Sequence, residues 1–179
     1  MTRSERIAMQ PLGPEQTFIV GEIWTLAWAA SVQRANLYVA GSKQTQEFRA
    51  KIKDFVGRDL LPHYESPCTE SQHYQNIALL VEFGTRAIPD ILRDGNYRYG
   101  VAQKLLNLAL KYYWCLGHIP APPHCPVDRI IIEKTPLRGR VNWTEIKDEA
   151  QYREVIEAIR QIAGSESLAR WELLNYSRR

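Results

Sequence analysis

Apolar residues recur at intervals of three and four along most of the chain, and this spacing constrains the fold more than any other feature. Strict alternation of apolar and polar residues, which marks a half-buried strand, is almost absent. Each helical stretch carries a stripe of large apolar side chains; the segments concerned are 15–39, 43–61, 70–83, 102–114 and 151–163. We therefore predict an all-α fold.

Short breaks separate these segments. Gly41 and Ser42 separate segment 15–39 from segment 43–61. Pro62 ends segment 43–61, because proline cannot continue a helix. We also predict short helices over 87–92 and 167–176. The run Ile130–Ile132 fits a buried strand by propensity, and equally a helix capped by Asp128. The helical pattern elsewhere leads us to treat it as a helix.

Length and composition suit a single helical domain over residues 1–179. An apolar content of 45% is enough to build a core for one domain of this size. No apolar run reaches the length of a membrane span, so we expect no membrane partner. A net charge of +3 permits a polyanionic partner without requiring one.

The cysteines and histidines do not suggest a metal or cofactor. Cys68, Cys115 and Cys125 lie far apart and form no Cys-x-x-Cys pattern, which argues against a disulfide framework and a structural zinc site. His118 and His124 lie near Cys125, but no fourth ligand stands at a usual spacing. We expect a cytoplasmic protein with no metal and no cofactor.

The segment 97–129 contains the most unusual residue of the chain. We expect a tight turn over 99–102, made possible by Gly100, followed by an apolar helix up to Trp114. Lys104 then falls in the first turn of a buried helix. The helix dipole and the apolar surroundings both disfavour an ammonium there, so Lys104 is a candidate amine nucleophile.

Residues 100–110 (GVAQKLLNLAL), followed by 126–128 (PVD), resemble the signature of the helix-hairpin-helix DNA glycosylases. This superfamily includes endonuclease III and the 8-oxoguanine glycosylases. Its Gly-Val-Gly hairpin precedes a lysine in the bifunctional members, and a Val-Asp pair follows the second helix of the motif. Here Ala102 stands in place of the second glycine, and the segment between Lys104 and Asp128 is longer than in compact members.

The resemblance implies a glycosylase-like helical bundle with a cleft, whose hairpin and catalytic segment span about 96–135. It also implies a monomeric DNA N-glycosylase of base excision repair, with AP-lyase activity. Asp128 would stabilise positive charge developing on the sugar. Lys104 would attack the same carbon and form a Schiff base, from which elimination nicks the strand. Oxidised guanine is our first expectation for the excised base.

The expected partner is duplex DNA with one nucleotide flipped out of the stack. The backbone N–H groups of the turn would hold a phosphate at the start of the helix, with Arg98 adding charge. These groups belong to Gly100, Val101, Ala102 and Gln103. Aromatic faces would stack on the flipped base, although such residues more often fill cores. The candidates are Trp24, Trp28, Trp114, His124 and Trp171.

Two other functions fit the sequence. A non-catalytic helix-hairpin-helix module would grip the DNA backbone without chemistry, and its binding would be sensitive to salt. A helical interaction protein would have no nucleic-acid partner at all. Which base an enzyme of this kind removes depends on pocket shape and a few polar contacts, which the sequence does not locate.

Overall fold

The computed structural model describes residues 13–176, and these residues confirm the all-α prediction. They contain a single β pairing, an isolated antiparallel bridge between Tyr38 and Leu92. No helix in this range is long and apolar enough to cross a membrane. Residues 13–176 contain seven α-helices: α1 (Pro14–Ser31), α2 (Thr45–Phe55), α3 (Glu70–Ala87), α4 (Tyr99–Cys115), α5 (Arg129–Ile132), α6 (Glu149–Ala163) and α7 (Leu168–Asn175).

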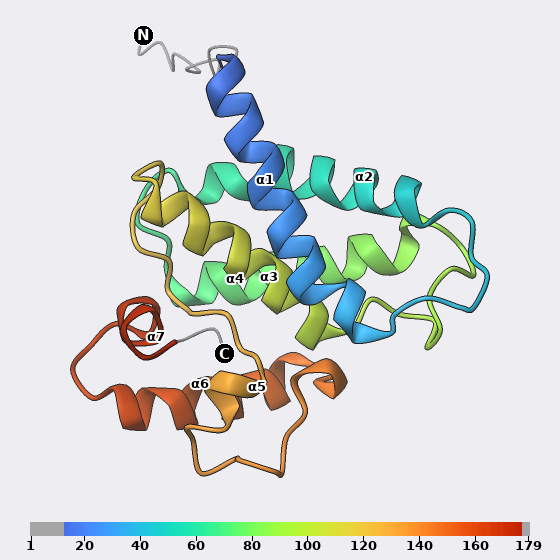
Figure 1. Cartoon of the computed structure of the whole chain (residues 1–179). Coiled ribbons are helices and arrows are strands. Elements are labelled where there is room, and N and C mark those ends of the chain that lie inside the picture. The colour runs from blue at the N-terminus through green and yellow to red at the C-terminus, as the bar shows by residue number, and fades with distance from the viewer. Residues whose placement is uncertain (1–12, 177–179) are drawn as a thin grey trace, which may run out of the picture.

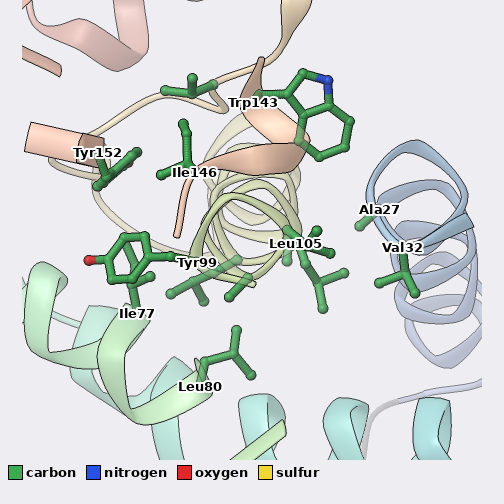
Figure 2. Packing of buried hydrophobic residues seen from close by; sticks show 14 of the residues in the cluster. Ala27, Val32, Ile77, Leu80, Tyr99, Leu105, Trp143, Ile146 and Tyr152 are labelled. Atoms are coloured by element: carbon green, nitrogen blue, oxygen red, sulfur yellow. The ribbon is translucent and has the colours of Figure 1, made fainter. Parts of the chain in front are cut away.

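Helix α4 is the centre of the fold. Every residue from Tyr99 to Asn107 is buried, so this part of the helix is enclosed on all sides. A helix with so wide an apolar surface needs partners all round. Figure 2 shows them: Ala27 of α1 lies on one side, Ile77 of α3 on another, and Trp143 and Ile146 on a third.

Helices α1 and α3 pack directly against α4, and α2 packs against α3. Phe48 of α2 is fully buried and contacts the rings of Trp28, Tyr38 and Tyr97. The pairs with Tyr38 and Tyr97 are edge-on, a geometry that adds to the stabilisation from burial. The first turns of α1 extend past the other helices (Figure 1), and Phe18 in this stretch is exposed.

Helices α5, α6 and α7 lie together at the other end of the molecule, away from α2 (Figure 1). Asp148 caps α6 by accepting a hydrogen bond from the N–H of Gln151, and Ser167 caps α7 in the same way. Val155, Ile156 and Ile159 of α6 face the core, as the helical spacing predicts. The boundaries of these last two helices agree with the sequence within two residues.

The predicted helix over 87–92 is wrong. Helix α3 continues to Ala87, residues 88–90 form a turn, and residues 91–93 then pair with residues 37–39. The N–H of Val39 donates to Ile91, and the N–H of Arg93 donates to Leu37. The same pairing explains why α1 ends at Ser31, well before the predicted end at Val39: backbone partners across the chain compete with helix continuation.

Connections between helices include tighter and wider turns. A π-helical turn, Val56–Leu60, and a 3₁₀ turn, Leu61–Tyr64, extend α2. Two further 3₁₀ turns lie at Gln33–Ala35, labelled η1, and Trp143–Glu145, labelled η4. Both of these last turns contribute residues to the pocket described next.

Candidate functional site

Lys104 and Asp128, which the sequence singles out, lie together. The Lys104 Nζ is 3.5 Å from the Asp128 Oδ2, and their side chains are 5% and 14% exposed. Lys104 belongs to the first half of α4, and Asp128 precedes α5. The long segment between them therefore closes back on its starting point, at a cost that grows only slowly with its length.

The surroundings of Lys104 lower the pKa of its amine. Burial lowers the pKa of Lys104, the Asp128 carboxylate acts in the opposite direction, and the charge of Arg34 lowers it further. The Nζ also lies 4.0 Å from the centre of the Trp143 ring, a contact that favours the ammonium. The net effect is a lowered pKa, which increases the fraction of nucleophilic amine near neutral pH.

Asp128 is held in place by the helix that follows it. Its Oδ1 accepts a hydrogen bond of 3.1 Å from the N–H of Ile131, which caps α5. This confirms the interpretation of Asp128 as a helix cap. Because Oδ1 is used by the cap, Oδ2 is the oxygen that faces Lys104. One carboxylate thus both begins a helix and borders the amine.

The pair lines a pocket of about 710 Å³ between α1, α4, α5 and α7. This volume is in the range of sites for small molecules and cofactors. Leu26 and Leu108 contribute apolar surface, and Trp143 and Tyr176 contribute aromatic surface. Arg34 and Arg129 add positive charge, so the pocket combines apolar walls with charged groups at its edge.

A second ion pair lines the same pocket. Lys111 Nζ contacts both carboxylate oxygens of Glu172, at 2.9 and 2.7 Å. Burial raises the pKa of Glu172, and the neighbouring Lys111 opposes this rise. Lys111 follows Lys104 by two turns of α4, so both amines lie on one face of the helix. The pocket therefore contains two amine–carboxylate pairs.

The predicted tight turn over 99–102 is not present. These residues form the first turn of α4 instead, and Gly100 does not have a positive φ. Position 100 needs a glycine for another reason: the carbonyl oxygen of Trp143 occupies the space that a side chain would take. Ala102 has helical backbone geometry, so this position needs no glycine.

The backbone groups expected to bind phosphate are engaged or enclosed. The N–H of Gly100 donates to the carbonyl of Ile146, and those of Val101 and Ala102 donate to the carbonyl of Arg98. Gln103 is fully buried. The first turn of α4 therefore offers no open phosphate cradle of the kind that a helix-hairpin-helix motif would provide.

Arg98 has a structural contact in place of the expected phosphate contact. Its guanidinium donates to the carbonyl of Ala35 and lies near the carboxylate of Asp94. These contacts tie the turn η1 to the start of α4. Because η1 carries Arg34 to the pocket, Arg98 contributes to the site indirectly.

None of the five predicted stacking residues lines the pocket. Trp24 and Trp28 are buried on α1, and Trp171 is buried on α7, where large aromatics fill the core. Trp114 is half-buried near the end of α4. Trp143 is the tryptophan at the pocket, and no local pattern distinguishes it in the sequence.

His124 belongs to a buried polar network. Its Nδ1 accepts from the Tyr152 hydroxyl at 3.1 Å, and its Nε2 lies 2.9 Å from the Glu70 carboxylate. Asn107 donates to the same hydroxyl, which orients the tyrosine proton toward His124. Burial lowers the pKa of His124 to about 4, so the imidazole is neutral near pH 7. No three His, Cys, Asp or Glu side chains in the described part of the chain are grouped to hold a metal ion.

The sequence interpretation missed Lys111, Glu172 and Arg34. The first had a usable signal, since a spacing of seven residues from Lys104 places both lysines on one face of an amphipathic helix. Glu172 and Arg34 reach the pocket only through the packing of α7 and η1 against α4. No family model, curated protein or solved structure matches the chain, so the site is interpreted from its geometry alone.

Proposed function

We propose that the protein is a DNA N-glycosylase with AP-lyase activity, in which Lys104 is the amine nucleophile and Asp128 its carboxylate partner. The observation that carries this proposal is the contact of 3.5 Å between a buried lysine amine and a carboxylate at the wall of a pocket of about 710 Å³. A pocket of this size admits a flipped nucleotide.

The chemistry follows from the two side chains. Lys104 as an ammonium first loses a proton, and the adjacent Asp128 oxygen is a suitable acceptor. The neutral amine attacks C1′ of the nucleotide while the bond to the base breaks. The base leaves with the bonding electrons and takes up the proton that Asp128 had accepted, which restores the Asp128 carboxylate. The sugar ring then opens: the C1′–O4′ bond breaks, a proton passes from Nζ to O4′, and a protonated imine forms between Nζ and C1′. Loss of a C2′ proton expels the 3′ phosphate, which nicks the strand.

Charge in the pocket supports the same reaction. Positive charge grows on the sugar as the base departs, and the Asp128 carboxylate, which is only 14% exposed, can stabilise it. Arg34 and Arg129 lie at the same pocket and suit contacts with flanking phosphates. The first turn of α4 plays no part in this arrangement, because its amides are bonded within the fold.

The second ion pair is suited to recognising the base. Lys111 offers a hydrogen-bond donor, and Glu172 offers acceptor oxygens. A base with a carbonyl beside a ring N–H, as in oxidised guanine, presents the complementary groups. A site built to bond such groups rejects bases that lack them, since its own polar atoms would then be left unpaired.

Borohydride trapping on duplexes that each carry one modified base or an abasic site tests the proposal. Borohydride reduces the imine to a stable amine, so the wild-type protein should give a covalent band. Lys104→Gln should abolish this band, whereas Lys51→Gln, which changes an exposed lysine of α2, should keep it. A band that persists in Lys104→Gln would rule out Lys104 as the nucleophile.

The non-catalytic DNA-binding module is the other outcome of that experiment. It would give binding that weakens with salt, no covalent band on any duplex, and no base release. Base release without a band would instead indicate a monofunctional glycosylase. Absence of any DNA binding at low salt would favour an interaction protein without a nucleic-acid partner.

A further inference from the structure

Gln103 makes an unusual set of hydrogen bonds inside the core. Its Nε2 donates to the carbonyls of Gly100 and Val127, at 2.9 and 2.8 Å. Its Oε1 accepts from the N–H of Val127 and from the side chain of Asn107, each at 3.2 Å. One side-chain amide thus bonds both backbone groups of Val127, as a neighbouring strand would.

Val127 needs such a partner. It is fully buried in the irregular segment between α4 and α5, where no helix or sheet supplies backbone hydrogen bonds. Buried backbone groups without partners are costly. Gln103 satisfies both groups and thereby fixes the path of the chain immediately before Asp128.

The hydrogen bonds between Gln103 and Val127 lie next to the candidate site. Gln103 precedes Lys104 on α4, and Val127 precedes Asp128 before α5. The two hydrogen bonds therefore join the neighbours of the two reacting groups. The Asp128 carboxylate is fixed on its other side by the N–H of Ile131, so its position is set from both directions along the chain.

We propose that Gln103 is a positioning residue, which holds the Asp128 carboxylate beside the Lys104 amine through its paired hydrogen bonds to Val127. The effect of Gln103 on catalysis rests on the proposed function. The effect of Gln103 on the geometry of Lys104 and Asp128 does not, so the two effects can be tested separately.

A purely structural role would have a different signature. Gln103 also belongs to the core network through Asn107, which bonds Tyr152. If it only stabilised the core, its removal would lower the free energy of unfolding and leave the environment of Lys104 unchanged. The measurement must therefore report on Lys104 itself.

NMR titration of the Lys104 Cε signal, in protein labelled with ¹³C-lysine, gives this report without DNA. Lys104→Arg identifies the signal by its loss. The charged groups that face this amine are Asp128, at the start of α5, and Arg34, in η1, and the Trp143 ring lies beside it. Lys111 and Glu172 lie further along the same pocket.

Gln103→Met keeps the length of the side chain and removes its hydrogen bonds. We expect the pKa of Lys104 to fall by at least about half a unit, because the carboxylate that raises it is no longer held in place. The rate of borohydride trapping should fall about tenfold or more, since small displacements of reacting groups are costly. Leu80→Ala, which opens a cavity on α3 in the same core but away from the pocket, should leave the Lys104 titration unchanged.

Gln103→Asn is the second variant, and it decides the question if Gln103→Met does not fold. It keeps an amide but is one methylene too short to bond both groups of Val127, so a smaller shift in the same direction is expected. An unchanged Lys104 titration in the folded variants, or an unchanged titration in Asp128→Asn, would overturn the inference. A shifted titration, in a protein whose wild type gives no covalent band on any duplex, would uphold the inference and refute the proposed function.

Discussion

The carbonyl oxygen of Trp143 occupies the space that a side chain on Gly100 would need. A Cβ placed on Gly100 would lie 1.8 Å from that oxygen and 3.1 Å from the Cβ of Ile146. The N–H of Gly100 also donates to the carbonyl of Ile146 at 3.0 Å. This close approach of η4 to α4 brings the Trp143 ring over Lys104.

Gly100→Ala should therefore destabilise the protein and alter the pocket together. The added methyl group meets backbone atoms and can be accommodated only if η4 moves, which we expect to cost roughly 3 kcal/mol or more of the free energy of unfolding. Urea denaturation measures this loss. Gly21→Ala is the control, because no atom lies within 4 Å of its added Cβ, and in a helix this change should stabilise by up to about 1 kcal/mol. Equal effects at the two positions would contradict the packing explanation.

Asp128→Asn should separate the two roles of Asp128. Asparagine is as good a helix cap as aspartate, so Asp128→Ala should lose about 1 kcal/mol more stability than Asp128→Asn. Both variants also leave the buried Lys104 without its carboxylate partner, and the stability lost for that reason is common to the two. In both variants the loss of the carboxylate should lower the pKa of Lys104 further and slow trapping about 100-fold or more. When the rate of trapping is measured as a function of pH, its acidic limb should lie at lower pH in Asp128→Asn than in the wild type. An acidic limb at the same pH would show that Lys104 is not the group that titrates.

Much of the fold follows from local sequence. Helices α2, α3 and α6 were predictable because each has a polar face and an apolar face. A side chain that caps the first turn also marks the start of α3, α6 and α7. The central helix was harder to delimit. Its first turn contains Gly100, which indicates a turn by local rules, whereas the contact with Trp143 shows that this glycine serves packing between distant segments.

Some residues of the candidate site are also marked by local sequence, whereas others are set by the packing of distant segments. Lys104 was found because a lysine is unusual in an apolar helix, and Asp128 because residues 126–128 resemble the end of the glycosylase motif. The cap made by Asp128 is also a local feature. Trp143, Glu172 and the paired bonds of Gln103 to Val127 depend on how segments far apart in the chain pack together. No periodicity or spacing encodes those contacts.

Acidification should weaken the fold through His124. Burial lowers its pKa from 6.5 to about 4, so between these values the unfolded chain binds a proton that the folded protein does not. This contribution is fully present above about pH 6.5 and is lost as the pH falls toward 4, by about 3 kcal/mol in all. Glu70 acts in the same direction: its burial is outweighed by His124 and Arg160, which lower its pKa.

Urea denaturation at pH 7 and pH 4.5 measures the effect, and His124→Gln provides the comparison. Glutamine can bond both Tyr152 and Glu70 but does not titrate, so the loss of stability between the two pH values should be smaller in this variant than in the wild type. An identical loss would show that His124 is not the group responsible, and would point to His73, whose pKa burial also lowers.

The ion pair between Lys111 and Glu172 should matter more for recognition than for stability. Glu172→Gln leaves Lys111 without its charge partner in a largely buried site, and we expect a loss of roughly 3 kcal/mol. The double change Lys111→Met with Glu172→Leu removes both charges and should recover most of this loss. If the pair reads the base, the double variant should still trap on an abasic duplex and should lose its preference among modified bases. A preference that survives the double change would show that recognition lies elsewhere in the pocket.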